Sequence, residues 1–353
     1  GIIYNRNTPV NKRSHILKSM TNVMEHRGPD DSGLYLNDWL GLGHRRLSML
    51  DLTPTGSQPM LSTDNNIVVV MNGEIYNHLD LRKYLVKKGY KYKGTSDTET
   101  VLFGFQEWGT KLFSKLNGIF SIAIYDKTSD KLILSRDRFG VKPLYYSSKS
   151  NFVFASEIKG ILTTGISPVL NHQSLHEFLY YGYALDNRTL FKDIYKVLPG
   201  QLLEIGKEGI VQYSEFWKPE LLLNESVHLS EDRAIKKTRI LLEKAVQRQL
   251  MSDVPVGIFL SGGIDSSAVT AFATQHYSKK IKTYSAGFDF DNGHNELPLA
   301  KKIAAQFDTE HHELMICGKH LPQIIETLVR QHDEPFSDAA NIPLYLLTKE
   351  VKG

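Results

Sequence analysis

The pattern SGGIDSS at 261–267 carries the most specific chemistry in this chain of 353 residues. An apolar stretch, VGIFL, precedes it, and a helix-forming stretch, AVTAFATQ, follows it. Gly262 and Gly263 let the backbone approach a phosphate group closely, while N–H groups of the turn and of the next helix point at the anion. Asp265 can hold a Mg²⁺ ion that neutralises phosphate charge. The hydroxyl donors are Ser261, Ser266 and Ser267. We therefore predict a phosphate-binding loop.

This loop is not of the Walker A type, because no G-K-S or G-K-T follows its glycines. The plain alternative is a glycine-rich turn from strand to helix that serines cap. The arrangement S-G-G-x-D-S-S after a strand resembles the pyrophosphate loop of the ATP pyrophosphatases, which adenylate a carboxylate or carbonyl and release pyrophosphate. The resemblance implies that the loop holds the β and γ phosphates of ATP, and that Leu260 and Ala286 lie beside the adenine.

Four polar motifs lie apart in the first hundred residues. They are HRGPDDSG at 26–33, HRRLSMLD at 44–51, NGEIYN at 72–77 and GTSDTE at 94–99. In order and spacing they resemble the glutaminase domain of class II glutamine amidotransferases, and the likeness continues through RDRFGVKPLYY and FASEIKGIL. With the phosphate loop, nearly the whole chain resembles the glutamine-hydrolysing asparagine synthetases.

A glutamine pocket must meet a carboxylate, an ammonium group and a side-chain amide. Arg46 can form a forked pair with the α-carboxylate. Asp97, assisted by Glu74, can pair with the α-ammonium group. The Asn72 amide and the Gly73 N–H can donate to the oxyanion that forms when the substrate amide is attacked. The resemblance implies these same roles, and it extends the glutamine-binding set to Leu47, Ser48, Met49 and Leu50.

Two of these motifs also have a purely structural interpretation. Ser96 and Glu99 form an S-x-x-E capping box, which would start a helix and place Asp97 on its first turn. Asn72 and Gly73 also match a type I′ hairpin turn, for which Asn-Gly is the strongest short signal.

Other charged residues are given no catalytic role. We interpret His26 and His44 as structural hydrogen-bonding groups. We interpret residues 136–138, Arg-Asp-Arg, as an internal ion network that shapes the core.

The glutaminase motifs contain no nucleophile. The resemblance implies a cysteine immediately before Gly1, because class II amidotransferases begin C-G-I and this chain begins G-I-I. A terminal cysteine has its own α-amine, with a pKa of about 8, as a local base for the thiol. Cys317 is the single cysteine of the chain, and its segment belongs to the other predicted domain.

The acceptor of the ammonia is the open question. The family continues with a further strand and an S-G-D-G-G-D-E loop that helps to complete the ATP and acceptor site, and we expect DEPFSDAANIP at 333–343 to contribute to that site. The resemblance implies aspartate as the acceptor. Three alternatives for the protein stay open. It could amidate another carboxylate, on a sugar or peptide; it could be an ammonia-using enzyme with a decayed glutaminase domain; or it could be a non-catalytic binding relative.

The elements that must position these groups change character along the chain. Short β-strand signals dominate to about residue 205, residues 206–228 are interpreted as a connection, and longer helices alternate with short apolar strands over 229–353. That alternation predicts an α/β doubly wound parallel sheet, which we interpret as an adenine-nucleotide domain. We expect residues 229–353 to correspond to the N-terminal part of the family's domain only. For 1–205, the resemblance implies the αββα sandwich of the N-terminal-nucleophile hydrolases.

Composition narrows the classes of partner. The net charge is +3 and basic residues are dispersed, so no nucleic-acid partner is predicted. No apolar run approaches the roughly 18 residues that span a bilayer, so no membrane partner is predicted either. One cysteine suits a reducing compartment, and we expect a cytoplasmic protein. The predicted ligands are ATP, Mg²⁺, glutamine and aspartate or another carboxylate; oligomeric state, a homodimer included, is left open.

Overall fold

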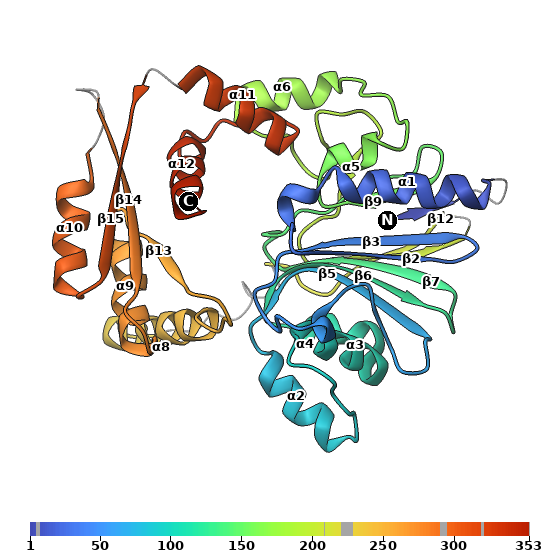
Figure 1. Ribbon diagram of the computed structural model, residues 1–353, viewed down its shortest axis with the longest axis horizontal. Helices are drawn as coiled ribbons and strands as arrows, with labels where there is room; N and C mark the ends of the chain where they lie inside the picture. The colour runs from blue at the N-terminus through green and yellow to red at the C-terminus, as the bar shows by residue number, and fades with distance from the viewer. Residues whose placement is uncertain (5–7, 208, 220–228, 290–294, 319–320, 353) are drawn as a thin grey trace. The chain divides into compact units, whose positions relative to one another are not determined.

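The computed structural model describes residues 1–4, 8–207, 209–219, 229–289, 295–318 and 321–352. The chain divides into two compact units, Gly1–Glu225 and Ser226–Gly353, which are described separately (Figure 1).

The described strands of the first unit form two six-stranded sheets in which every pairing is antiparallel. One sheet has the order β10 (Tyr195–Lys196), β8 (Tyr145–Ser147), β9 (Phe152–Ala155), β1 (Ile2–Ile3), β3 (Leu40–Arg46), β2 (Asp31–Leu36). The other has the order β12 (Gly209–Glu215), β11 (Gln201–Gly206), β7 (Lys131–Arg136), β6 (Gly118–Asp126), β5 (Ile67–Ile75), β4 (Met60–Leu61).

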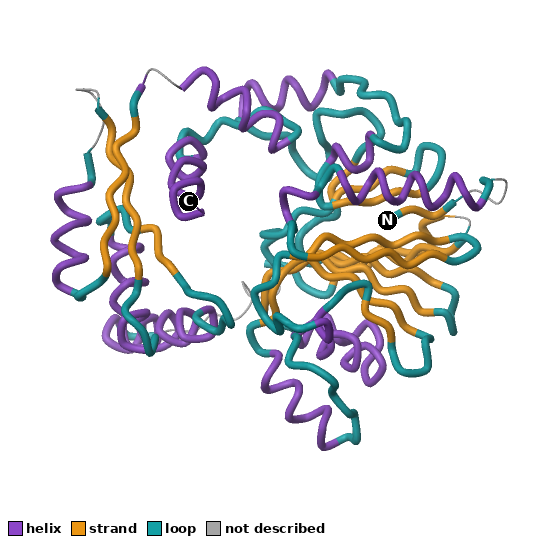
Figure 2. The backbone as a smooth tube through the Cα atoms, viewed as in Figure 1, coloured by secondary structure: helices purple, strands orange, loops and turns teal. Residues whose placement is uncertain are grey.

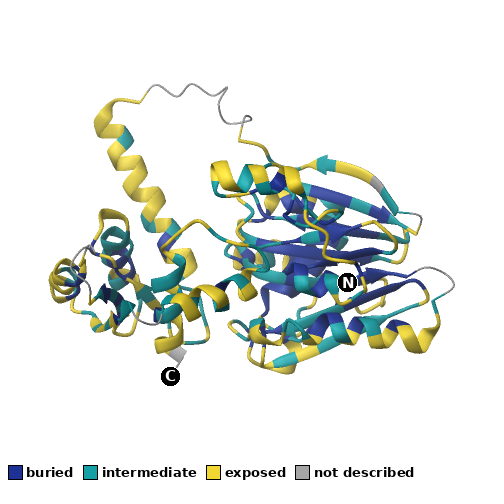
Figure 3. Ribbon diagram, turned by 90° about the horizontal axis from the view of Figure 1, so that it is seen from above, coloured by how far each residue is buried: buried dark blue, intermediate teal, exposed yellow. Residues whose placement is uncertain are grey.

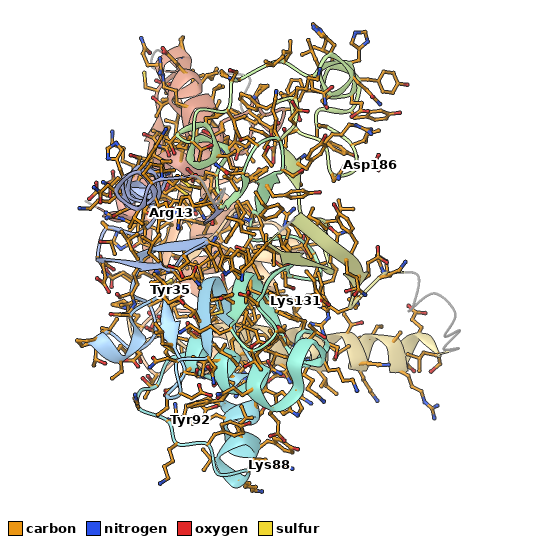
Figure 4. All side chains as sticks on the ribbon, turned by 90° about the vertical axis from the view of Figure 1, so that its right-hand side faces the viewer. Arg13, Tyr35, Lys88, Tyr92, Lys131 and Asp186 are labelled. Atoms are coloured by element: carbon orange, nitrogen blue, oxygen red, sulfur yellow. The ribbon has the colours of Figure 1, made fainter. Side chains whose placement is uncertain are left out.

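Helices cover the outer face of each sheet (Figures 1 and 2). On the first sheet lie α1 (Val10–Asn22) and α5 (Ile158–Leu162), and beyond the second lie α2 (His78–Lys87), α3 (Asp97–Trp108) and α4 (Leu112–Lys115). The remaining helix of this unit with eight or more described residues is α6 (His172–Tyr181). In Figure 4, Arg13 of α1 lies at one outer layer, Tyr35 and Lys131 in the two sheets, and Tyr92 and Lys88 at the other outer layer. The predicted αββα sandwich is confirmed.

Each interface between layers has an apolar core. Between the sheets, Leu42 and Val68 belong to one buried cluster with Leu134. Phe113 and Phe120 belong to the cluster beneath α3 and α4, and Leu17 of α1 packs in the cluster that includes Ile158. Because the side chains of a strand alternate between its two faces, both sheets contribute to an inner and an outer core.

The last strand of the first unit was not expected. The weak periodicity of residues 206–228 indicates a connection, but Gly209–Glu215 forms β12 and pairs with β11 from Gly206↔Gly209 to Gln201↔Glu215. Its alternation is weak, and the ladder with β11 gives its backbone N–H and C=O groups the partners that folding requires. Residues 220–228 lie outside the described ones.

The second unit has a parallel sheet with the order β13 (Gly257–Phe259), β14 (Lys282–Phe288), β15 (Glu310–Ile316) in its described residues. Its helices are α8 (Glu231–Gln249), α9 (Ile264–His276), α10 (Leu297–Gln306), α11 (Leu321–His332) and α12 (Asn341–Lys352). Helices α10 and α12 both contact β14 and β15 and lie on opposite sides of them (Figure 1). The predicted α/β alternation with a parallel sheet is confirmed. Strand β13 forms one edge of this sheet as described.

The two units differ in burial. The strands of the first unit are mostly buried, whereas the second unit is mostly intermediate or exposed (Figure 3). No helix in the described parts of the chain is long and apolar enough to cross a lipid bilayer.

Candidate active site

A cavity of about 380 Å³ opens in the first unit. Eight of the nine residues predicted to bind glutamine line it: Arg46, Leu47, Met49, Leu50, Asn72, Gly73, Glu74 and Asp97. Ser48 is not among the lining residues, and its backbone N–H donates to Oδ2 of Asp30 at 2.7 Å. Gly1 also lines the cavity, so residues from the start of the chain, β3, β5 and the first turn of α3 share one space.

Asn72 and Gly73 lie inside β5, so the hairpin-turn alternative is wrong. Their register partners on β6 are Ser121 and Phe120. Gly73 has φ of +150°, and a Cβ on it would lie 2.1 Å from the carbonyl oxygen of Ile119, so only glycine fits here. Asn72 donates weakly from its side-chain amide to Oγ of Ser156 at 3.4 Å.

Gly73 presents its N–H away from β6. Both backbone groups of Phe120, its register partner, bond to Asp137 instead: the N–H donates to the side-chain Oδ2 at 3.1 Å, and the C=O accepts from the backbone N–H at 2.8 Å. On the same side of β5, the Met71 N–H donates to Oε1 of Gln58 at 2.7 Å and the Ile75 N–H to Oδ2 of Asp97 at 2.8 Å. Because N–H groups alternate along a strand, Gly73 points the same way as these two, and it lines the cavity.

Asp97 and Glu74 form a pair of crowded carboxylates. Asp97 is only 5% exposed, and burial raises its pKa to about 6, although backbone N–H groups stabilise the anion. Burial and the charge of Asp97 raise the pKa of Glu74 to about 6, against the opposing effect of Lys142. Two neighbouring carboxylates with raised pKa values make a site that an added cation would stabilise.

The start of α3 is capped, but not by the reciprocal box that the sequence predicts. Oγ of Ser96 accepts from the Thr98 N–H at 3.2 Å, as an N-cap does. Glu99 reaches back past Ser96 and accepts from the N–H groups of Lys93 and Gly94 at 2.8 and 3.0 Å. The Ser96 N–H donates to Oδ2 of Asp51 at 3.2 Å. Asp97 is nevertheless fixed on the first turn, as predicted.

Arg46 ends β3 and is 7% exposed. Its guanidinium donates to three carbonyls of the following loop, those of Thr53 at 3.1 Å, Leu50 at 3.3 Å and Asp51. A guanidinium has five N–H donors, so the carbonyls leave donors for a ligand carboxylate. Arg46 therefore folds the loop that carries Leu47, Met49 and Leu50, a role that its position in the motif did not reveal.

Lys142 is a cavity residue that sequence analysis missed. It lines the same space as Glu74 and Asp97, and burial lowers the pKa of its ammonium group. Its turn is held by the buried Asp137, whose carboxylate accepts from the N–H groups of Phe139, Val141 and Lys142 at 3.0 to 3.1 Å. A lysine between the apolar Val and Pro-Leu of GVKPL is the only sequence signal for it.

Residues 136–138 do not form the predicted ion network. Arg136 donates to the carbonyls of Lys142, Val197 and Gly140, and Arg138 to those of Leu116 and Ser114. The three side chains hydrogen-bond to backbone groups, because turns and strand ends here leave carbonyls and N–H groups without partners in a β-ladder.

His26 and His44 both bond within the protein. Nε2 of His26 lies 3.1 Å from Oε1 of Glu157, and Nε2 of His44 lies 3.2 Å from the carbonyl oxygen of Met71. Burial lowers the pKa of His44 to about 4, so it is neutral at physiological pH.

In the second unit SGGIDSS covers the turn after β13 and the first turn of α9, with Gly263 as the N-cap of the helix. Gly262 has φ of +80°, which favours glycine, and a Cβ on it would lie 3.0 Å from the Ala300 nitrogen. Ser261 and Gly263 are exposed, as is Asp265 in the first helical turn. This arrangement matches the predicted strand, loop and helix.

The serines of this loop are partly committed to each other. Oγ of Ser266 lies 3.0 Å from Oγ of Ser261 and donates to the Gly263 carbonyl at 3.2 Å. Oγ of Ser267 is buried and has no protein partner in the described residues. Buried hydroxyls are normally hydrogen-bonded, so Ser267 fits a loop that binds a ligand.

The residues predicted beside adenine belong to neighbouring strands. Leu260 directly follows β13, is 1% exposed, and donates from its N–H to the Tyr284 carbonyl at 2.9 Å. Ala286 lies within β14. Among the described residues, no group of three His, Cys, Asp or Glu side chains is placed to hold a metal ion by itself.

Together, an αββα sandwich with a cavity lined by charged residues and a parallel sheet with a glycine-rich loop define an amidotransferase-type unit joined to an α/β unit. Residues 1–217 match the family model described as glutamine amidotransferase domain, and residues 237–353 match the one described as asparagine synthase.

Three curated relatives are similar to this chain over most of its length. Asparagine synthetase (glutamine-hydrolyzing) 1 of Bacillus subtilis is 34% identical over 96% of this chain and 53% of that protein. "Putative asparagine synthetase (glutamine-hydrolyzing) 2" of Methanocaldococcus jannaschii is 31% identical over 94% of this chain and 68% of that protein. Amidase chyE of Penicillium rubens is 32% identical over 91% of this chain and 50% of that protein.

The chain belongs to the family of glutamine-hydrolysing asparagine synthetases. It spans about half the length of most of the curated relatives named above.

Proposed function

We propose that the first unit hydrolyses glutamine to glutamate and ammonia. The observation that carries this proposal is the Gly73 N–H, which faces the cavity between two N–H groups that already have acceptors. A donor held in that way is suited to an oxyanion. Arg46 on one side and Asp97 with Glu74 on another supply opposite charges for the α-carboxylate and α-ammonium groups of the substrate.

We further propose that a cysteine bonded to the Gly1 nitrogen supplies the nucleophile. Gly1 lines the cavity, and its nitrogen donates to the Phe154 carbonyl at 2.6 Å. Burial lowers the pKa of the Gly1 amine to about 4, whereas an amide N–H there would make the same bond without a charge. A Cβ on Gly1 would lie 2.4 Å from the Phe154 ring, which favours glycine at this position.

The chemistry then follows two steps. The cysteine sulfur attacks the side-chain carbonyl carbon of glutamine, and the thiol proton passes to the cysteine's own α-amine. The amide nitrogen then takes that proton and leaves as ammonia, and a thioester remains. Water hydrolyses the thioester and releases glutamate with the free thiol. Asn72 and the Gly73 N–H stabilise the oxyanion in both steps.

For the second unit we propose binding of ATP phosphates by Ser261, Gly262, Gly263, Ser266 and Ser267, with adenine beside Leu260 and Ala286. The partnerless Oγ of Ser267 and the exposed N-terminus of α9 support this assignment. Asp265 would hold Mg²⁺ through the bound pyrophosphate group, and that ion would offset phosphate charge.

The whole enzyme would then adenylate a carboxylate, which ammonia converts to the amide with release of AMP; pyrophosphate leaves at the adenylation step. We propose aspartate as acceptor and asparagine as product, on the family's name and on both matched domains. One relative of similar identity is named an amidase and not an asparagine synthetase, so we keep the same chemistry on another carboxylate as a second candidate. We also propose a cytoplasmic location, which the single cysteine of the chain supports.

The first test is glutamate release from glutamine by this chain carrying one cysteine immediately before Gly1. We expect steady glutamate and ammonia formation, and loss of at least about 100-fold when that cysteine is replaced by serine. Arg46→Met is expected to raise KM for glutamine. Binding of glutamine without any release by the cysteine-bearing chain would instead identify a binding relative, and no binding at all would reject the glutamine site.

A further inference from the structure

Asp51 lies in the loop after β3, next to the short helical turn Pro54–Gly56. It is 4% exposed and has φ of +54°, a left-handed conformation that aspartate tolerates better than most residues. Neither its burial nor its conformation is explained by the roles assigned so far.

The carboxylate of Asp51 joins its own loop to the start of α3. Oδ1 accepts from Oγ1 of Thr53 at 2.6 Å, and Oδ2 accepts from Oγ1 of Thr55 at 2.8 Å. Oδ2 also accepts from the N–H groups of Thr95 and Ser96 at 2.8 and 3.2 Å. Although burial alone would raise it, these donors bring the pKa of Asp51 to about 2. The side chain is therefore an anion that receives hydrogen bonds from both segments.

The backbone of Asp51 contacts Arg46. Its carbonyl oxygen accepts from Nη2 of Arg46. A continuous path thus runs from the Arg46 guanidinium to Asp51, then through the Ser96 N–H to Asp97, the next residue in the chain. Arg46 and Asp97 are the two groups proposed to hold the opposite charges of the substrate.

Two glycines, Gly94 and Gly56, lie against the side chains of this path. A Cβ on Gly94 would lie 2.3 Å from Oδ2 of Asp51 and 2.4 Å from Oγ1 of Thr55. A Cβ on Gly56 would lie 2.2 Å from Nη2 of Arg46. A side chain at either glycine would therefore displace the Asp51, Thr55 or Arg46 side chains that form this path.

We propose that Asp51 is a positioning residue that fixes the separation between Arg46 and Asp97 and so selects a ligand bearing both an α-carboxylate and an α-ammonium group. This inference rests on the proposed glutamine site. Two opposite charges held at one spacing favour a zwitterion over a ligand that carries only one of the charges, because only the zwitterion engages both.

The test compares Asp51→Asn with Asp64→Asn. Asparagine keeps the shape of Asp51 but loses its charge and one acceptor oxygen. Asp64 is a control for the loss of a hydrogen-bonded loop carboxylate: it accepts from the hydroxyl of Ser62 and the backbone N–H of Asn66, but it is exposed and lies outside the cavity lining. Calorimetry measures binding of L-glutamine and of glutaramate, which is glutamine without the α-amino group.

We expect Asp51→Asn to weaken L-glutamine binding by about 10-fold or more and glutaramate binding by less than about 3-fold, so that discrimination between them falls. Asp64→Asn should change neither. Equal losses for both ligands would mean a merely structural role and would overturn the proposal, as would unchanged binding of both.

Amide hydrogen exchange at Thr95 and Ser96 provides a readout that needs no ligand. Exchange should accelerate in Asp51→Asn and stay as in the parent chain in Asp64→Asn. If the chain without either substitution bound no glutamine, the proposed function would fail. Amide hydrogen exchange would still decide whether Asp51 connects the loop after β3 to the start of α3. Unchanged exchange at both amides would overturn that connection.

Discussion

The two carboxylates of the cavity predict a pH dependence. Glu74 and Asp97 have pKa values of about 6, above their ordinary values, because burial disfavours their charges. Between the ordinary values and about 6, the unliganded fold holds more protons than the unfolded chain, so its stability falls as pH rises through that interval. The α-ammonium group of bound glutamine would favour the charged carboxylates, so binding would lower the pKa values of Glu74 and Asp97.

Glutamine should therefore bind more tightly as pH rises from 5 to 7, with proton release near pH 6. Calorimetry in buffers of different ionisation enthalpy measures that release directly. Asp97→Asn should abolish most of it. Affinity that stays flat from pH 5 to 7 in the parent chain would contradict an ammonium site at these carboxylates.

At the level of single residues, the sequence indicated most of the cavity but not its connections. Arg46, Gly73 and Asp97 lie in motifs whose chemistry can be named from their types. Lys142 and Asp51 could not be found that way, because their roles depend on contacts with segments far away in the chain: Asp51 meets Thr95 and Ser96 more than forty positions on. Ser48 matched the motif, yet its side chain is not part of the lining.

Among the elements, β5 has the strictest requirement. Gly73→Ala should lower the free energy of unfolding by about 3 kcal/mol, because the added Cβ overlaps the Ile119 carbonyl in addition to its unfavourable φ. Gly89→Ala is the control: Gly89 has φ of +98° with no neighbour within 4 Å, so about 1 kcal/mol is expected. Urea unfolding measures both, and equal losses would refute the overlap.

The elements that were predicted best from the sequence combine three independent signals. The stretch from VGIFL to AVTAFATQ has an apolar strand, glycines at the turn and a helix start, and the structure follows all three. Strand β12 was missed because its side chains alternate weakly and its pairing with β11 supplies what periodicity did not show. The capping box was predicted from two residues, of which only Ser96 caps the helix.

For the molecule as a whole, each described apolar core lies within one unit. The first unit holds three large clusters and the second two small ones. Since buried apolar area is the main source of stability, we expect two thermal transitions, the second unit unfolding first.

In our proposal, glutamine binds only to residues of the first unit. It should therefore raise the midpoint temperature of the later transition and leave that of the earlier transition unchanged. Differential scanning calorimetry with and without glutamine tests this. A single cooperative transition that glutamine shifts as a whole would show that the units unfold together.

The place of β13 at a sheet edge has a practical consequence. Of the strands that the structure describes, only β14 pairs with it, and its sequence, Gly-Ile-Phe, carries no charge or proline to discourage another partner. Its outer backbone groups are a template on which a strand from a second molecule can add. A strand added at this edge would lie beside the glycine-rich loop that follows β13, so such a contact would crowd that loop.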